Sequence, residues 1–164
     1  MNLAERIVQE EENARIDVMT GLPNRRVYEE DMKHFAEEPL PKDLHYVVVD
    51  INGLKDVNDS YGHETGDKLI VGAARCFEEV FRGWGRQYRI GGDEFAAVLT
   101  DRDYENRDEL LRLFDERCLE KRNQEKDAWE QVDVARGMAV YDPEEHDSVY
   151  GVVRRADKIM YEHK

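Results

Sequence analysis

The chain has 164 residues, 40% of them hydrophobic, which suits a single domain with a buried core. Lys and Arg together number 24 against 38 Asp and Glu, and the net charge of -14 would repel a phosphate backbone, which argues against a nucleic-acid partner. No apolar run approaches the roughly 20 residues that span a bilayer, and residues 1–16 lack the apolar core of a signal peptide, so we expect no membrane segment and a cytoplasmic location.

The N-terminal segment, residues 1–16, has the pattern of a charged helix with a thin apolar stripe of Leu3, Ile7 and Ala14. Such a helix is too polar to pack fully within a domain. We therefore expect a linker helix that enters from an upstream sensory or regulatory domain and leads into a domain over residues 17–164.

Hydrophobic periodicity defines the elements that follow. The run "LHYVVVDI" (44–51) is short, apolar and rich in β-branched residues, which is typical of a buried central strand. Apolar residues recur with helical period over residues 65–82. The remaining pattern predicts strands at 86–90, 94–99 and about 132–141, and helices at about 27–35, 105–123 and 148–163.

After the first helices, the predicted order is β-α-β-β-α-β followed by a helix. This order is typical of a ferredoxin-like α+β fold, an antiparallel sheet flanked by helices that palm-type polymerases and nucleotide cyclases can share. In this topology the first and second strands point the same way, and the third lies beside the first. Asp50, Asp93 and Glu94 should therefore converge at one edge of the sheet.

Three carboxylates at one strand end would repel one another unless a cation lies between them. Hard oxygen ligands suit Mg²⁺, which typically takes one or two protein carboxylates and completes its shell with water and phosphates. The carbonyl of Ile51 is a further oxygen at this edge. A simpler alternative is that Gly91 and Gly92 only form a hairpin turn, because glycine tolerates positive φ, with solvated acidic residues beside it.

The stretch that follows Asp50 carries groups that suit a nucleotide. Lys55 supplies a cation for phosphate, and Asn58 with Asp67 supplies the donor and acceptors that a guanine edge requires. Each residue also has a simpler interpretation: Asn58 or Asp67 could cap a helix that begins near Gly66, and Lys55 could be a surface lysine.

Several motifs, in the right order and spacing, resemble those of GGDEF domains of bacterial diguanylate cyclases. They are "DVMTGLPNRR", "VVVDINGLKDVNDSYGHETGDKLI", "RIGGDEF" and "RRADKIMYEHK", and they extend from Asp17 to Lys164. The resemblance implies that each domain binds one GTP with Mg²⁺ or Mn²⁺. It further implies that two copies of the domain form a catalytic homodimer of two half-sites, in which 3′-hydroxyl attack on α-phosphate joins two GTP into cyclic di-GMP with loss of pyrophosphate.

The resemblance also assigns roles to individual residues. Asp93 matches the position usually proposed to accept the proton of the attacking hydroxyl, in addition to binding metal. The metal ligands implied are Asp50, the Ile51 carbonyl, Asp93 and Glu94; the triphosphate contacts are Lys55 and Lys164; the guanine contacts are Asn58 and Asp67.

Two further positions bear on regulation. Asp17 matches the residue that fixes the turn between the signalling helix and the domain, with Arg89 as its expected partner, although it could equally cap a helix or turn. The inhibitory Arg-x-x-Asp of the family reads Arg82-Gly83-Trp84-Gly85 here, so we expect weak or absent product inhibition through this site. Two alternatives to an active cyclase stay open: a catalytically silent module that binds GTP or cyclic di-GMP, and a palm-type polymerase, which the acidic charge disfavours.

Overall fold

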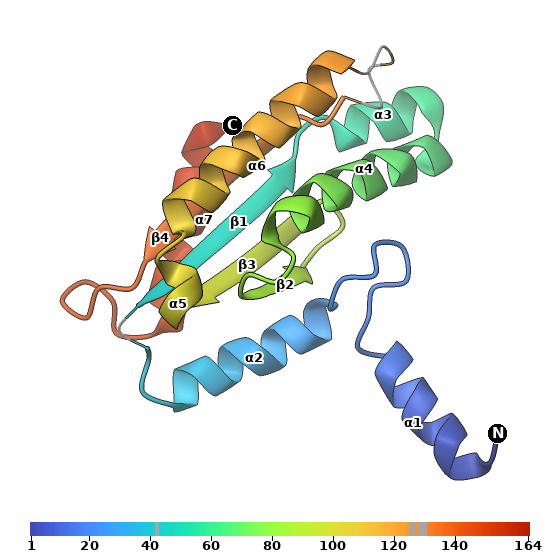
Figure 1. The fold of residues 1–164 in the computed structure, drawn as a ribbon. Helices are drawn as coiled ribbons and strands as arrows, with labels where there is room; N and C mark the ends of the chain where they lie inside the picture. The colour runs from blue at the N-terminus through green and yellow to red at the C-terminus, as the bar shows by residue number, and fades with distance from the viewer. Residues whose placement is uncertain (42, 125–126, 128–130) are drawn as a thin grey trace.

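An antiparallel sheet of four strands, in the order β2-β3-β1-β4, forms the centre of the fold (Figure 1). The structure is a computed structural model that describes residues 1–41, 43–124, 127 and 131–164. The strands are β1 (Leu44–Ile51), β2 (Arg86–Arg89), β3 (Glu94–Thr100) and β4 (Val134–Val140). The helices are α1 (Leu3–Asn13), α2 (Arg25–Glu37), α3 (Leu54–Tyr61), α4 (His63–Phe81), α5 (Asp101–Tyr104), α6 (Arg107–Gln124) and α7 (Val149–His163). This arrangement confirms the predicted ferredoxin-like α+β fold.

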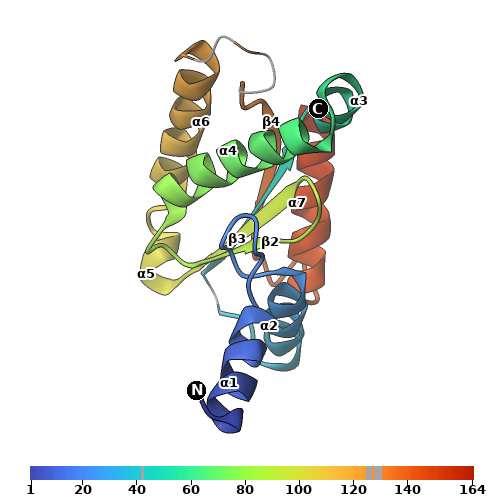
Figure 2. The same ribbon diagram turned by 90° about the vertical axis from the view of Figure 1, so that its right-hand side faces the viewer.

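Helices cover both faces of the sheet, α4 and α6 on one face and α2 and α7 on the other (Figure 2). All eight residues of β1 are buried, which explains why its sequence is an almost continuous apolar run. Its side chains alternate between two cores: Val47 and Val49 pack on the α4 and α6 side, and Tyr46 and Val48 pack on the α2 and α7 side. By the same alternation, the side chain of Asp50 lies on the face of the sheet that carries Tyr46 and Val48.

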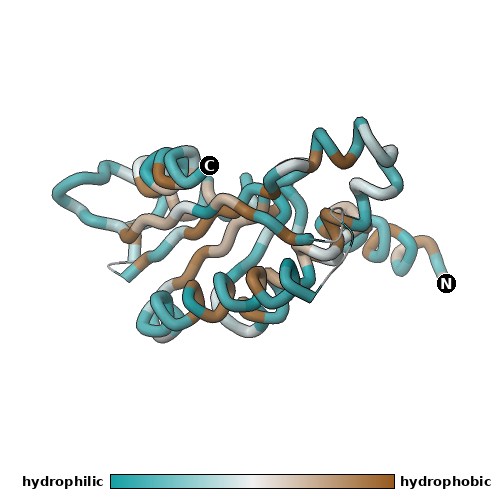
Figure 3. Tube along the Cα trace, turned by 90° about the horizontal axis from the view of Figure 1, so that it is seen from above, coloured by the Kyte–Doolittle hydropathy of each residue, from teal (hydrophilic) through white to brown (hydrophobic). Residues whose placement is uncertain are grey.

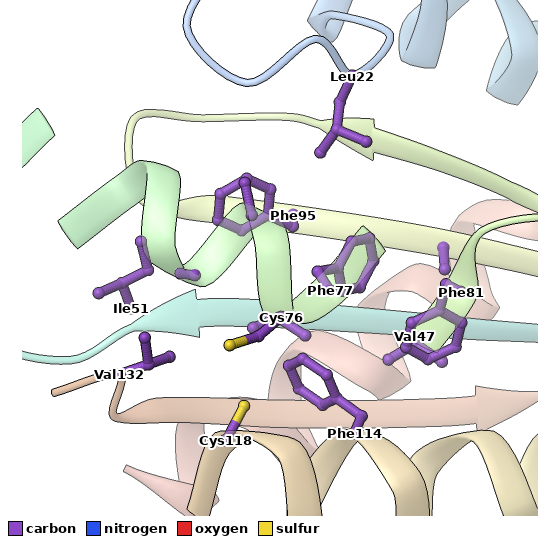
Figure 4. Close-up of a cluster of buried hydrophobic side chains, with 14 of the residues drawn as sticks. Leu22, Val47, Ile51, Cys76, Phe77, Phe81, Phe95, Phe114, Cys118 and Val132 are labelled. Atoms are coloured by element: carbon purple, nitrogen blue, oxygen red, sulfur yellow. The ribbon is translucent and has the colours of Figure 1, made fainter. Parts of the chain in front are cut away.

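The first core is dominated by aromatic rings that lie between β1, α4 and α6 (Figure 4). Phe77 is fully buried, and its ring centroid lies 4.9 Å from that of Phe81 and 5.9 Å from that of Phe114. Cys76 and Cys118 are free and buried in the same core. Coloured by hydropathy, the chain shows its hydrophobic segments along the strands and polar segments on the outer surfaces of the helices (Figure 3). This packing holds β1, the strand that carries Asp50 next to its last residue.

Two short helices are absent from the prediction. Helix α3 has Val57 as its buried residue, and α5 spans only four residues, so neither presents enough apolar positions to reveal a helical period. Helix α3 begins directly after the end of β1. It therefore places residues 54–61 at the same end of the sheet as Asp50 (Figure 1).

Helix α1 projects from the domain, as Figures 1 and 2 show. It contains no buried residue, and Leu3, Ile7 and Val8 expose large fractions of their apolar side chains. The predicted polar helix with a thin apolar stripe is therefore present within residues 1–16. Among the described helices, none has the length and apolar character required to cross a membrane.

Candidate active site

The end of β1 and the start of β3 bring the predicted carboxylates together. Asp50 and Glu94 are directly paired in the β1–β3 register, so their side chains lie on the same face of the sheet. The backbone N–H of Ile51 donates a 2.9 Å hydrogen bond to the Asp93 carbonyl, which fixes the turn against β1. The convergence expected from the topology is therefore present.

Asp50 is the most buried of these carboxylates, with 6% of its surface exposed. Its Oδ1 atom is buried and has no hydrogen-bond partner. Burial raises the pKa of Asp93, and the negative charge of Asp50 raises it further. The same two causes, burial first, raise the pKa of Glu94. The cluster thus holds negative charge that a cation would stabilise.

Lys164 supplies one positive charge to this cluster. Its Nζ lies 2.6 Å from Asp50 Oδ2, and this hydrogen bond raises the pKa of the lysine. The resemblance places Lys164 against a triphosphate. In the structure its partner is the most buried carboxylate of the site.

The chemistry of these groups fits a divalent cation. An unpartnered buried carboxylate oxygen is the donor that Mg²⁺ or Mn²⁺ prefers, and the Ile51 carbonyl lies at the same strand end. In the described part of the chain, no three His, Cys, Asp or Glu side chains are placed to hold a metal by themselves. Such an ion would therefore need backbone oxygens, water or ligand phosphates to complete its shell, as Mg²⁺ commonly does.

The glycine pair before Asp93 is not explained by turn geometry alone. Neither Gly91 nor Gly92 takes a positive φ, so the hairpin does not require glycine for its backbone conformation. A Cβ on Gly92 would meet nothing within 4 Å, and one on Gly91 would meet only the Glu94 side chain, 3.5 Å away. Neither the backbone conformation nor crowding by the described protein atoms therefore requires glycine at these two positions, and the pair leaves open space beside the carboxylates.

Asn58 lies on helix α3 and Asp67 on the following helix, α4, and the Asn58 side chain lies against Gly66, the residue before Asp67. A Cβ on Gly66 would lie 1.7 Å from Asn58 Oδ1, so glycine is required for the Asn58 amide to rest against α4. Helix α4 begins after Gly62 and has no side-chain cap, which shows that neither Asn58 nor Asp67 caps it. The capping alternative is therefore wrong.

Lys55 lies in the first turn of α3 and is exposed to solvent. Because α3 follows β1 directly, Lys55 stands at the carboxylate end of the sheet. Its exposure is compatible both with a phosphate contact and with the simpler surface interpretation.

The turn that replaces the inhibitory motif has a backbone that excludes the missing aspartate. Gly85 has φ +62, and a Cβ at this position would lie 2.1 Å from the Val98 carbonyl oxygen. Its N–H donates a 2.8 Å hydrogen bond to Asp103 Oδ2. The turn is therefore rebuilt around glycine and differs from the family motif in more than one side chain.

Asp17 has the expected partner. Arg89 Nη1 lies 2.9 Å from Asp17 Oδ1, and Asp17 Oδ2 also accepts bonds from the backbone and hydroxyl of Thr20. Burial alone would raise the pKa of Asp17, but the hydrogen bonds from Thr20 and Arg89 hold it below its usual value. Asp17 therefore both stabilises its own turn and reaches β2.

Arg25 is a residue that the sequence did not indicate. Its guanidinium donates a 2.6 Å hydrogen bond to the carbonyl of Ile90, the residue before the glycine pair. The side chain thus connects the start of α2 to the turn that carries Asp93. A long-range bond from a side chain to a backbone carbonyl leaves no periodicity or motif from which it could be inferred.

The fold agrees with the comparison to known families. The family model described as "Diguanylate cyclase, GGDEF domain" matches residues 14–164, so the chain belongs to the GGDEF family.

Two curated relatives illustrate the similarity. The diguanylate cyclase DgcZ of Escherichia coli is 33% identical over 92% of this chain and 50% of its own length. The diguanylate cyclase VdcA of Vibrio cholerae is 29% identical over 99% of this chain and 48% of its own length. The chain thus spans about half the length of the curated relatives it matches.

Among solved structures, the coiled coil and GGDEF domain of DgcB from Caulobacter crescentus, in complex with c-di-GMP, matches with a TM-score of 0.80. Its sequence identity is 25%, and the match covers 97% of this chain and 85% of that chain.

Proposed function

We propose that this chain is a diguanylate cyclase domain, which joins two GTP molecules into cyclic di-GMP and pyrophosphate. The observation that carries this proposal is the buried, unpartnered oxygen of Asp50 beside Asp93 and Glu94. Family membership and the two named cyclases support the same conclusion.

In this proposal Asp50, the Ile51 carbonyl, Asp93 and Glu94 hold Mg²⁺ or Mn²⁺. The bound ion would neutralise phosphate charge and polarise the α-phosphate toward attack. The open space at Gly91 and Gly92 lets the phosphates of GTP approach the backbone.

Lys55 and Lys164 are proposed to contact the triphosphate. Lys164 compensates the charge of Asp50 and is proposed to turn to phosphate when the nucleotide binds. Since phosphoryl transfer depends mainly on alignment and charge stabilisation, two lysines beside the phosphates would contribute directly to the rate.

Asn58 and Asp67 are proposed to read the guanine base. Asp67 is exposed and accepts hydrogen bonds, which suits the N1 and N2 hydrogens of guanine, and Gly66, the residue before it, leaves room for the Asn58 amide against α4. The substrate of this proposal is accordingly GTP.

The reaction needs two copies of the domain. The 3′-hydroxyl oxygen of one GTP forms a bond to the α-phosphorus of the other, the bond from that phosphorus to pyrophosphate breaks, and a second such step closes the ring. Asp93 is proposed to accept the hydroxyl proton, in addition to holding the metal. Each copy contributes one half-site with its own GTP.

We further propose that residues 1–16 form a signalling helix and residues 17–164 the catalytic domain. Helix α1 has no buried residue, and the exposed side chains of Leu3, Ile7 and Val8 suit contact with the same helix of a second copy. An upstream sensory domain would act by changing how the two copies face each other.

The test is to fuse the chain to a parallel dimeric coiled coil, supply GTP with Mg²⁺ or Mn²⁺, and detect cyclic di-GMP by chromatography with mass detection. We expect product with the native sequence and none with Asp93→Asn. Asp101→Asn is the matched control, because Asp101 follows the opposite end of β3 and has φ 52, a conformation that asparagine accepts. Tight GTP binding without product would favour the silent binding module instead.

A further inference from the structure

Arg89 lies between two segments that are far apart in the sequence. On one side its Nη1 atom donates to both carboxylate oxygens of Asp17, at 2.9 and 3.1 Å. On the other side its Nη2 donates to the Gly92 carbonyl at 2.9 Å and its Nε to the Gly91 carbonyl at 3.2 Å. One guanidinium thus bonds to the residue that follows helix α1 by a few positions and to both glycines before Asp93.

The first segment, residues 14–24, is called here the linker turn. It is closed by its own hydrogen bonds: the Asp17 N–H donates to Leu22 O and the Gly21 N–H to Asp17 O, both at 2.7 Å. The backbone N–H of Arg89 also donates to Pro23 O at 2.9 Å. Hydrogen bonds hold the linker turn together and join it to β2. We therefore expect a displacement of α1 to move the linker turn as one unit and, with it, the side chain of Arg89.

The second segment, residues 90–94, is called here the Gly-Gly turn. Ile90 N–H donates to Glu94 O at 2.9 Å, and Ile51 N–H donates to Asp93 O at the same distance. These bonds fix both ends of the turn to the sheet. The Gly91 N–H also donates to Glu94 O, at 3.3 Å. The carbonyls of Gly91 and Gly92 both accept hydrogen bonds from Arg89, so this side chain contributes to the placement of the middle of the turn.

The chemistry requires arginine in particular. The guanidinium presents five donors in a fixed planar fork, whereas the ammonium of lysine is a single point charge on a flexible stem. Only 13% of the Arg89 side chain and 21% of that of Asp17 are exposed, so solvent screens the pair weakly.

We propose that Arg89 is a positioning residue that couples the linker turn to the Gly-Gly turn, so that movement of α1 changes the placement of Asp93. The catalytic consequence rests on the proposed function, but the structural coupling does not. Through this coupling an upstream domain would change the placement of Asp93 within each half-site, in addition to bringing two copies together.

The test measures residue-level amide exchange by NMR in the nucleotide-free protein for wild type, Asp17→Asn and Arg89→Lys. We expect both variants to speed exchange of the Ile51 and Ile90 amides by about tenfold, although Asp17 touches neither turn residue directly. Arg86→Lys is the matched control: Arg86 lies on the same strand and pairs with Asp31 of α2 at 3.1 Å. Its exchange rates at Ile51 and Ile90 should equal those of wild type.

A second readout is the initial rate of cyclic di-GMP synthesis by the tethered dimer. Asp17→Asn and Arg89→Lys should lower kcat by about tenfold while KM for GTP stays within about twofold, because the guanine contacts lie on α3 and α4. Thermal unfolding confirms that the variants are folded.

Faster exchange in Arg89→Lys together with wild-type exchange in Asp17→Asn would overturn the coupling and leave Arg89 as a local brace. Wild-type exchange in both variants would overturn the proposal altogether. If the wild-type chain makes no cyclic di-GMP, the proposed function fails while the exchange measurement still decides whether the turns are coupled.

Discussion

The ammonium of Lys164 lies 2.6 Å from Asp50 Oδ2, while the other oxygen of the same carboxylate is buried without a partner. The lysine therefore neutralises one side of Asp50 and leaves the other side available. A cation that binds Asp50 must compete with this ammonium, and a nucleotide that binds beside it offers the ammonium a new anionic partner.

Replacing Lys164 by glutamine should consequently have two opposite effects. Without nucleotide, Mn²⁺ binding should tighten by about threefold, because the partly exposed Lys164 ammonium no longer competes for the buried Asp50 carboxylate. Cyclic di-GMP synthesis should fall by about tenfold or more, because a charged contact to phosphate is lost. Titration of Mn²⁺ by electron paramagnetic resonance and product chromatography measure the two effects.

Lys158→Gln is the control for that experiment, since Lys158 is an exposed residue of the same helix, α7. It should change neither quantity. Unaltered Mn²⁺ affinity in Lys164→Gln would show that the ion pair does not form in solution.

Gly66→Ala should damage recognition of the guanine base. The new methyl would lie 1.7 Å from the present position of Asn58 Oδ1, so the Asn58 amide must move away from α4. We expect kcat/KM for GTP to fall by about tenfold, the effect of losing one or two hydrogen bonds to the base.

Gly72→Ala provides a comparison within the same helix, α4. Its methyl would meet Val132 at 3.7 Å, an ordinary contact, and alanine should stabilise the helix by about 0.5–1 kcal/mol. Steady-state kinetics give kcat/KM for GTP in both variants. Equal values in Gly66→Ala and Gly72→Ala would contradict a role of Asn58 in binding the base.

The strands of the sheet could be predicted from the sequence because buried strands have short, almost continuous runs of apolar residues. Strand β1 was predicted with its observed bounds, 44–51, and the pairing of Asp50 with Glu94 follows once the order of strands is known. Helix α3 was missed because a single buried residue, Val57, gives no periodicity; its flanking glycines, 53 and 62, were the available signal.

The bonds that tune the site could not be predicted. Arg25 to the Ile90 carbonyl and Arg89 to the glycine carbonyls join side chains to backbone atoms across the fold. Such contacts depend on the final placement of α2 and β2, to which neither composition nor spacing is sensitive. The positive φ of Gly85 could not be predicted either, because it too depends on the final placement of the surrounding strands.

Restoring the inhibitory motif by Gly85→Asp should fail to restore product inhibition. The position has φ +62, and a Cβ would lie 2.1 Å from Val98 O, so both strain and overlap oppose the change. We expect the free energy of unfolding to fall by at least about 2 kcal/mol in urea titrations.

The control for this substitution is Gly83→Asp. Gly83 has a similar φ of +81 but open space around its Cβ position, so strain alone should cost about 1 kcal/mol. If Gly85→Asp were as stable as wild type and its synthesis were inhibited by cyclic di-GMP, the described backbone of this turn would be wrong.

Stability should depend on pH through His45, which is 1% exposed and has a buried Nδ1 without a hydrogen-bond partner. Burial lowers the pKa of His45 to about 4, and the charges of Arg107 and Arg136 oppose its protonation further, while Asp108 acts in the opposite direction. Above its unfolded pKa of 6.5 the residue is neutral in both states and contributes no pH dependence.

As the pH falls below 6.5, His45 binds a proton in the unfolded chain, whereas in the native state it stays neutral until about pH 4. The free energy of unfolding should therefore fall across this window, by about 3 kcal/mol in total, since each pKa unit corresponds to about 1.4 kcal/mol.

His45→Leu isolates this contribution, because leucine does not titrate and needs no partner for Nδ1. The difference in unfolding free energy between wild type and variant, measured by urea titration from pH 4 to 8, should be constant above 6.5 and shift in favour of the variant below it. The carboxyls of Asp93 and Glu94, whose raised pKa values work in the opposite direction, are common to both proteins and cancel in the difference. A difference that does not change with pH would mean that water or a partner group reaches His45 in the native state.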